Sequence, residues 1–406
     1  MIKLRKKNEE IKGVVYLPVS KSIFNRQLII SALSGGAICD ISEEFPDDCN
    51  TLISALKSNS KNINIGHAGT AMRFLTAYFS LSQEEITLEG SQRMHKRPIS
   101  ILVDSLNEMG AEIEHINGND CPPLLIKSSS IDGGEVSISG SVSSQYISAI
   151  LLISPYLPKG LILNITPPLV SKPYVDMTLA LMHENGVMVD QRGLRIETTP
   201  NKYSVQDKEV ELDWSAASFW YELVALNPQS EILLSGLHRS TLQGDAIMPD
   251  LYSKLGVQTI FEEGGVRIKH IGSKETSFEV DCTEFPDLAL PVACTCAGLG
   301  LDTKLTGLST LLIKETNRIL ALKTELNKLG ISVETSEDAL WFERQEIRKK
   351  ECDFNTYDDH RMAMCLAPLT SIISSSTIHM PEVVSKSYPK YWDMMSIFFV
   401  VSKFED

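Results

Sequence analysis

Long apolar runs, paired cysteines and an excess of positive charge are all missing from this chain, and each absence excludes a class of protein. No window approaches the roughly 18 apolar residues of a membrane span, and the charged N-terminal segment MIKLRKKNEEIKG has no apolar core of a secretory signal. The eight cysteines include no CxxC pair and no Cys/His spacing typical of zinc. We therefore expect a cytoplasmic protein with reduced thiols, no membrane association and no metal site.

Basic residues are outnumbered, with 38 Lys and Arg against 52 Asp and Glu and a formal net charge of −14. This balance does not favour nucleic-acid binding, which needs broad positive fields. Any anionic ligand would have to be held by local cations. The 43% hydrophobic and 22% charged fractions are typical of folded globular chains, and 406 residues exceed what one core usually serves, which predicts at least two domains.

A repeated pattern runs along the chain: a short strand, a loop of small or charged residues, and an apolar helix. After a shorter first interval the helix starts recur about every 70 residues, near Ser22, Gly69, Ser144, Ser215, Asp287 and His360.

A second pattern alternates with the first: an amphipathic helix that ends in glycine, followed by a strand, a polar turn and another strand. The glycines are Gly110, Gly186, Gly256 and Gly330. Together the patterns predict an α/β fold of six βαβαββ modules, three in each of two domains, with the first copy truncated before Gly69. Helices that are apolar all round are buried, so we expect helices inside and sheets outside. An ordinary doubly wound α/β fold is the alternative.

The loops at the starts of the inner helices carry cations and hydroxyls, although the chain as a whole is acidic. Helix N-termini bind anions because their backbone N–H groups lack partners. Taken singly, each motif is also consistent with a purely structural role, such as a surface turn for SKS or a helix cap for DHR. Their recurrence at equivalent positions of the modules favours an anion-binding site.

These motifs resemble those of the 5-enolpyruvylshikimate-3-phosphate (EPSP) synthase family, the 3-phosphoshikimate 1-carboxyvinyltransferases. The matching segments run in family order from residue 18 to 389: PVSKSIFNR, HAGTAMR, KRPI, SSQY, SKPY, LQGD, FPD, IKETNR, YDDHRMAM and SKSYP. The resemblance implies the inside-out α/β barrel fold, with one domain at 19–211, the other at 1–18 plus 212–406, and the active site in the interdomain cleft. Closure of the two domains over the substrates would exclude water.

The activity implied by the resemblance is transfer of the enolpyruvyl group of phosphoenolpyruvate to the 5-hydroxyl of shikimate 3-phosphate. Phosphate is released by addition and elimination, on the route to chorismate and the aromatic amino acids. The two metabolites would be the partners of the chain. No cofactor is implied, and a monomer is expected.

Site residues are implied position by position. Shikimate 3-phosphate would be bound by Lys21, Ser22, Arg26, Ser143, Ser144, Gln145, Ser171, Asp287 and Lys314. Phosphoenolpyruvate would be bound by Lys21, Gly69, Arg97, Gln145, Arg318, Arg361 and Lys386. Asp287 would be the base for the 5-hydroxyl and Glu315 the proton donor to the methylene, with Lys21 as an alternative proton carrier. Thr70, Tyr174 and His360 are secondary candidates.

Three positions depart from the family pattern. The family usually has Gly at the position of Val19, Asn at that of His67 and Pro at that of Phe74. His67 would lie beside the phosphoenolpyruvate site and could add pH dependence. An Asn that contacts shikimate 3-phosphate in some members is replaced here by Thr310, so that role is not transferred.

Two rival functions are considered. The sister enolpyruvyl transferase that acts on UDP-N-acetylglucosamine typically carries a Cys before its RP motif, whereas this chain reads SQRMHKRP. A non-catalytic, anion-binding repeat protein would not need carboxylates such as Asp287 and Glu315 in its anion loops.

Overall fold

The computed structural model describes residues 1–206, 208–240, 242–348 and 350–404. The chain forms two compact units, each described separately below. Unit 1 comprises Met1–Ser20, Glu44–Pro46 and Glu211–Asp406, and unit 2 comprises Lys21–Glu43 and Asp47–Val210.

One module of unit 1 shows the repeating architecture in a single continuous segment. Its elements are β14 (Ser277–Asp281), α9 (Ala289–Leu299), β15 (Asp302–Thr306), α10 (Arg318–Lys328), β16 (Glu334–Thr335) and β17 (Ala339–Phe342). The four strands form a sheet in the order β14-β15-β17-β16. The first two strands are parallel because a helix crosses between them, whereas β16 and β17 form an antiparallel hairpin. This is the βαβαββ module that the sequence predicts.

Unit 2 contains two modules of the same kind. The first consists of β3 (Asn62–Asn64), α3 (Gly69–Phe79), β4 (Ile86–Glu89), α4 (Ser100–Glu108), β5 (Glu112–His115) and β6 (Leu124–Lys127). The second consists of β7 (Gly134–Ser139), α5 (Ser144–Ile153), β8 (Leu161–Thr166), α6 (Lys172–Glu184), β9 (Val189–Arg192) and β10 (Arg195–Thr198). Their sheets have the orders β3-β4-β6-β5 and β7-β8-β10-β9, which match the module in unit 1.

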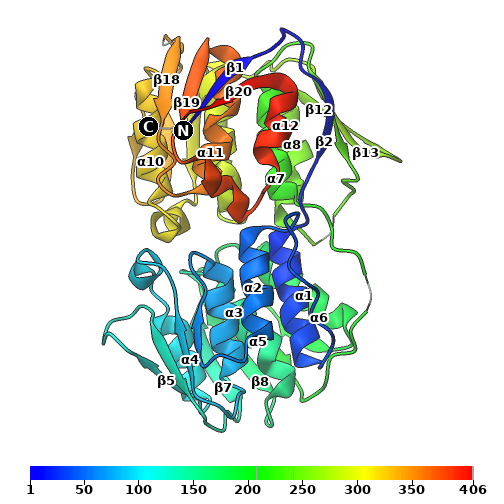
Figure 1. The fold of residues 1–406 in the computed structure, drawn as a ribbon, viewed down its shortest axis with the longest axis vertical. Helices are drawn as coiled ribbons and strands as arrows, with labels where there is room; N and C mark the ends of the chain where they lie inside the picture. Colours follow the sequence, from blue (N-terminus) through cyan, green and yellow to red (C-terminus); the bar gives the residue numbers. More distant parts are fainter. Residues whose placement is uncertain (207, 241, 349, 405–406) are drawn as a thin grey trace. The chain divides into compact units, whose positions relative to one another are not determined.

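The other two modules of unit 1 each include one strand from the N-terminal segment. One contains β2 (Lys12–Tyr16), α7 (Trp214–Ala225), β11 (Glu231–Ser235), α8 (Met248–Lys254), β12 (Val257–Glu262) and β13 (Gly265–His270). The other contains β18 (Glu351–Phe354), α11 (His360–Leu366), β19 (Ser375–Ile378), α12 (Tyr391–Phe398), β20 (Phe399–Lys403) and β1 (Ile2–Lys6). Strand β1 lies between β19 and β20, so the two chain ends belong to one sheet (Figure 1).

The first module is reduced to two helices, α1 (Lys21–Leu33) and α2 (Asp47–Lys57), which pack against each other and against α3. The described part of the chain therefore forms five four-stranded sheets, not six. Residues 58–61 connect α2 directly to β3, which leaves no room for the hairpin that follows the outer helix in the other modules. The truncation predicted before Gly69 thus removes a sheet but keeps the helices.

The inner helices are buried and the sheets are half-exposed, as predicted. Every residue of α7 and α11 is buried, whereas strand β8 alternates between buried and partly exposed positions. The outer helices are followed by Gly110, Gly186, Gly256 and Gly330, which have φ of 106°, 84°, 88° and 92°. That left-handed conformation closes a helix at no steric cost only for glycine. In the described residues, no helix is both long and apolar enough to span a membrane.

Candidate active site

In unit 1 the predicted site residues come from the starts of three helices, from one loop and from the end of one short helix. Asp287 lies in the short helix η4 (Pro286–Leu288) that leads into α9. Lys314 and Glu315 lie between η5 (Ser309–Ile313) and α10, whose first residue is Arg318. Arg361 is the second residue of α11, and Lys386 ends the short helix η7 (Pro381–Lys386). The repeat therefore brings segments distant in sequence to the same end of the inner helices.

Asp287 is surrounded by three cations. Its Oδ1 lies 2.7 Å from Arg318 Nη1 and 3.7 Å from Lys314 Nζ, and its Oδ2 lies 3.1 Å from Arg361 Nη2. Burial by itself would raise the pKa of this carboxyl, but the charges of Arg361, Lys314 and Arg318 outweigh it and hold the pKa well below its usual range. The same burial lowers the pKa of Lys314, although Asp287 opposes that effect.

Glu315 belongs to the same network. Its Oε2 lies 3.0 Å from Arg318 Nη2, and its Oε1 lies 3.7 Å from Lys386 Nζ. All six site residues predicted in this half of the chain are thus members of one continuous set of ion pairs.

Asp359 completes this network, and sequence analysis did not assign it to the site. Its side chain caps α11 by accepting the Arg361 N–H at 2.9 Å, and it also accepts two hydrogen bonds from Arg318. The buried Arg318 consequently contacts three carboxylates. Burial opposes its charged form, but Asp359, Glu315 and Asp287 together raise its pKa. The sequence signal at Asp359 was that of a helix cap, which is correct but incomplete.

Asp245, in the LQGD motif, is a second carboxyl that the sequence argument left without a role. Its Oδ2 accepts a hydrogen bond from Ser215 Oγ, while its buried Oδ1 has no hydrogen-bond partner in the described part of the chain. Burial raises the pKa of Asp245 to about 6, although the charge of Arg361 and the Ser215 hydroxyl oppose the rise. Asp245 is therefore a buried carboxyl with a raised pKa that lies within the field of Arg361.

In unit 2, Lys21 is the first residue of α1, and its Nζ lies 3.0 Å from Asp48 Oδ2. Both side chains are largely buried, at 15% and 5% exposure. Asp48 follows Asp47 at the start of α2, where acidic residues are common for reasons of helix polarity. Sequence alone could not distinguish this buried partner of Lys21 from an ordinary helix-start residue.

Arg26 is almost fully buried, and four of its five N–H groups bond inside unit 2. Nε donates to Thr178 Oγ1 at 2.7 Å, Nη1 to the Ser22 carbonyl at 2.7 Å, and Nη2 to Ser148 Oγ at 3.0 Å and the Tyr174 carbonyl at 3.1 Å. Burial lowers the pKa of Arg26 to about 10, so it stays charged at neutral pH. The side chain ties α1, α5 and α6 together, and its predicted contact with shikimate 3-phosphate stays a prediction.

Gly69 and Arg97 lie against each other at the start of α3. A Cβ added to Gly69 would stand 2.5 Å from Arg97 Nη1, so the guanidinium occupies the space that only glycine leaves open. Next to this pair, Gln145 Nε2 donates to Thr70 Oγ1 at 3.2 Å. The predicted residues Gly69, Arg97 and Gln145 are thus brought together, and Thr70 lies with them.

Three of the four predicted serines lie at the starts of α5 and α6. Ser143 caps α5 by accepting the Gln145 N–H, and Ser144 is the buried first residue of that helix. Ser171 precedes α6 with φ of 53°, a left-handed conformation that is uncommon for serine. Strained backbone of this kind is frequent at functional sites.

The positions that depart from the family pattern have distinct surroundings. The exposed His67 lies with Nδ1 3.0 Å from Ser91 Oγ, at the beginning of the segment that leads to Arg97. The buried Phe74 ring lies under the Arg26 guanidinium, with Cζ 5.4 Å from the ring centroid. Val19 forms an isolated bridge with Leu212 in unit 1. The Thr310 hydroxyl is buried and has no hydrogen-bond partner in the described residues.

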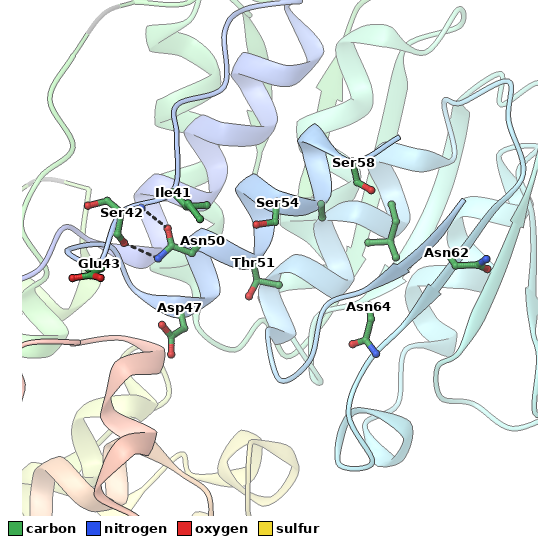
Figure 2. A pocket seen from close by; sticks show the side chains of 12 residues that line it. Ile41, Ser42, Glu43, Asp47, Asn50, Thr51, Ser54, Ser58, Asn62 and Asn64 are labelled. Carbon is green, nitrogen blue, oxygen red and sulfur yellow. Dashed lines mark hydrogen bonds between the residues drawn. The ribbon is translucent and has the colours of Figure 1, made fainter. Parts of the chain in front are cut away.

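A polar groove in unit 2 contains none of the predicted site residues. It has a volume of about 670 Å³ and lies between residues 41–43, one face of α2, and β3. Figure 2 shows Asn50 bonded to Ser42 at one end, with Thr51 and Ser54 following along α2 and Ser58 just after its end. The groove borders β3, the strand that follows the truncated first module. Nowhere in the described ranges do three or more His, Cys, Asp or Glu residues form a group that could hold a metal ion.

Carboxylates and cations lie at the starts of buried helices, and the helices belong to repeated βαβαββ modules. This combination defines a class of α/β repeat proteins that bind small polyanionic ligands. Comparison with known proteins identifies the family within this class. A family model described as EPSP synthase (3-phosphoshikimate 1-carboxyvinyltransferase) matches residues 50–395. The chain therefore belongs to the EPSP synthase family.

Two relatives and one solved structure illustrate the match. The chain is 44% identical over 387 residues to a 3-phosphoshikimate 1-carboxyvinyltransferase of Bacteroides fragilis, covering 95% of this chain and 94% of the relative. It is 33% identical over 416 residues to that of Colwellia psychrerythraea, covering 95% and 97%. Its fold is similar to an EPSP synthase structure from Acinetobacter baumannii, with a TM-score of 0.76, 20% identity and 99% of each chain covered. The predicted fold class is thereby confirmed.

Proposed function

We propose that this chain is a 3-phosphoshikimate 1-carboxyvinyltransferase that transfers the enolpyruvyl group of phosphoenolpyruvate to the 5-hydroxyl of shikimate 3-phosphate. The observation that carries the proposal is the position of Asp287, 2.7 Å from Arg318 and 3.1 Å from Arg361, in one network with Glu315 and Lys386. A reaction between two polyanions needs such cations, and deprotonation of an alcohol needs such a carboxylate.

The cations that sequence analysis assigned to the substrates would balance the substrates' negative charge. Each phosphate group carries roughly −1.5 to −2 at neutral pH, and each substrate also has a carboxylate. Arg361 and Arg97 offer planar forks suited to bidentate contact with phosphate or carboxylate, while Lys386 and Lys21 supply compact charges. In this proposal each substrate is bound by the residues that sequence analysis assigned to it, with the serines of α5 and α6 at the phosphate of shikimate 3-phosphate.

The base is Asp287. While Arg361, Lys314 and Arg318 surround it, these charges keep its pKa low and its basicity weak. An anionic substrate that engages Arg361 and Arg318 would weaken their hold on the carboxylate and raise its proton affinity. Asp287 could then accept the proton of the 5-hydroxyl while the hydroxyl oxygen forms its new bond to carbon 2 of phosphoenolpyruvate.

Protonation of the methylene carbon completes the addition. Glu315 is the proposed donor because its carboxylate lies in the same network, and Lys21 is the alternative. In the elimination the new methyl group returns one proton to the deprotonated donor, the carbon–oxygen bond to phosphate breaks, and the double bond of the enolpyruvyl ether forms. The proton held by Asp287 passes to the leaving phosphate, which regenerates the carboxylate. The net products are 5-enolpyruvylshikimate 3-phosphate and inorganic phosphate.

A phosphate-release assay with both substrates tests this proposal. We expect turnover by the unaltered chain that depends on both substrates and falls by at least about 10³-fold in Asp287→Ala. Glu279→Ala changes an exposed carboxylate on β14, in the same module as Asp287, and should keep full activity. Enolpyruvyl transfer to UDP-N-acetylglucosamine would establish the sister activity instead, and anion binding without turnover would indicate a non-catalytic protein. Gel filtration near 45.0 kDa would show the expected monomer.

A further inference from the structure

Arg73, in the HAGTAMR motif, has a defined set of contacts that the proposed reaction does not yet use. It lies one turn into α3, and its side chain is buried at 4% exposure. Nη1 donates to the Gly69 carbonyl at 3.1 Å and contacts Met94 Sδ at 3.4 Å, and Nη2 donates to the Pro98 carbonyl at 3.3 Å. One guanidinium therefore connects the first turn of α3 to Met94 and Pro98, which lie on either side of Arg97 in the sequence.

Tyr146 reaches the same carbonyl from another helix. Its hydroxyl donates to the Pro98 carbonyl at 2.5 Å, and its ring lies 5.9 Å from Arg73 Cζ. Tyr146 is the third residue of α5 and directly follows Gln145, which bonds to Thr70 on α3. The starts of α3 and α5 and the residues next to Arg97 are thus connected by hydrogen bonds.

The beginning of the same segment is also held. The Ser91 N–H donates to the Gly66 carbonyl at 2.9 Å, and the Ser91 hydroxyl lies 3.0 Å from His67. Between these two fixed ends, the short helix η1 (Met94–Lys96) leads directly to Arg97. Because Arg97 fills the space beside Gly69, any shift of Pro98 relative to α3 changes the position of the guanidinium at that helix start.

We propose that Arg73, assisted by Tyr146, is a positioning residue that holds Arg97 against Gly69 and thereby determines the affinity for phosphoenolpyruvate. The inference rests on the proposed function, because it assigns the Gly69–Arg97 pair to that substrate. Arg73 itself does not contact substrate in this proposal. Its two carbonyl partners and the ring of Tyr146 occupy its guanidinium.

Arg73→Lys and Tyr146→Phe test the inference with small changes. Lysine keeps the charge but cannot span two carbonyls and the ring face at once. Phenylalanine keeps the ring and removes one hydroxyl donor. The matched control is Tyr78→Phe, which removes a hydroxyl near the other end of α3. Steady-state kinetics should be measured with each substrate varied in turn, together with thermal unfolding and hydrogen exchange over residues 91–99.

We expect the KM for phosphoenolpyruvate to rise about 10- to 100-fold in Arg73→Lys and about 3- to 10-fold in Tyr146→Phe, while the KM for shikimate 3-phosphate changes less than about 2-fold. Exchange over residues 91–99 should accelerate in both variants. Because the two donors share the Pro98 carbonyl, their effects in the double variant should not multiply. Tyr78→Phe should match the unaltered chain.

Three results would overturn the inference. Unchanged kinetics for phosphoenolpyruvate in both variants would remove it while leaving the proposed function intact. A similar rise of both KM values with a lower melting temperature would indicate a purely structural role. Failure of the unaltered chain to turn over the two substrates would overturn the proposed function and this inference together.

Discussion

Arg318 and Asp359 form a bidentate ion pair that is shielded from solvent, with Nε 2.7 Å from Oδ2 and Nη2 3.1 Å from Oδ1. The side-chain exposures are 2% and 0%. The same arginine reaches Asp287 and Glu315, so a single buried residue orients both carboxylates that we assign to proton transfer. Asp359 thus acts on the proposed chemistry through Arg318.

Asp359→Asn should destabilise unit 1 by about 3–5 kcal/mol, because it removes one partner of a buried charge and leaves Arg318 with excess positive charge. Turnover should also fall, since Arg318 would no longer be held toward Asp287. Urea unfolding followed by tryptophan fluorescence measures the first effect selectively, because all four tryptophans of the chain lie in unit 1. Asp353→Asn, an exposed change on β18, is the control and should leave both quantities unaltered.

Asp48→Asn should lower kcat/KM by on the order of 10²-fold, because Lys21 loses the carboxylate that fixes its ammonium group at 3.0 Å. Steady-state phosphate release measures this effect. The comparison is Asp40→Asn, which removes the partner of Lys57 at the surface, where Asp40 is 96% exposed. Exposed pairs contribute little, so that variant should be indistinguishable from the unaltered chain. Equal behaviour of the two variants would contradict a functional role for the Lys21–Asp48 pair.

Gly69→Ala should raise the KM for phosphoenolpyruvate by about tenfold or more, because the added methyl group would stand 2.5 Å from Arg97 Nη1 and displace the guanidinium. Gly264→Ala is the matched control, since a methyl group there meets no atom within 4 Å. Kinetics with varied phosphoenolpyruvate distinguish the two variants. An unchanged KM in Gly69→Ala would show that the position of Arg97 does not matter for this substrate.

The buried carboxyl of Glu222 should make the free energy of unfolding depend on pH. It lies within the buried helix α7, and neither carboxyl oxygen has a hydrogen-bond partner in the described residues. Burial, and then the neighbouring Cys365, raises its pKa well above the usual 4.5. The folded state therefore keeps the proton after the unfolded state has lost it. This contribution is fully present below about pH 4.5 and is lost as pH rises toward the folded-state pKa.

Glu222→Gln should remove that contribution. Between pH 5 and 8 the unaltered chain should lose more stability than the variant, by up to about 1.4 kcal/mol for each pH unit below the folded-state pKa. Urea unfolding monitored by tryptophan fluorescence over this range gives the difference directly. Parallel curves for the two proteins would show that Glu222 ionises normally in the folded chain.

Much of the fold could be predicted from local patterns. The helix starts expected near Gly69, Ser144 and His360 are found at those residues, because small or polar residues there give way abruptly to apolar periodicity. The module repeat was visible because each copy must satisfy the same packing demands. What the patterns could not supply was the pairing of β1 with β19 and β20, since a strand's partner leaves no mark on its own sequence.

The residues of the candidate site likewise fall into those that the sequence predicted and those that only the structure revealed. Cations such as Arg361 and Lys386 stand out because they occur at equivalent points of a repeat in an acidic chain. Their partners do not stand out: Asp48 and Asp359 are each consistent with an ordinary helix start, and Arg73 with a core helix. Only the packed structure distinguishes a capping carboxylate from one that also holds a buried arginine.

The amino-acid sequence by itself determined the module, its number of helices and the chemical types that face anions, because periodicity, helix ends and local charge are short-range properties of a chain. The tertiary structure decided which charges neutralise one another, which arginines lie buried against carbonyls, and which strands close each sheet. These outcomes depend on burial and on distances between segments far apart along the chain, and both arise only when the helices pack.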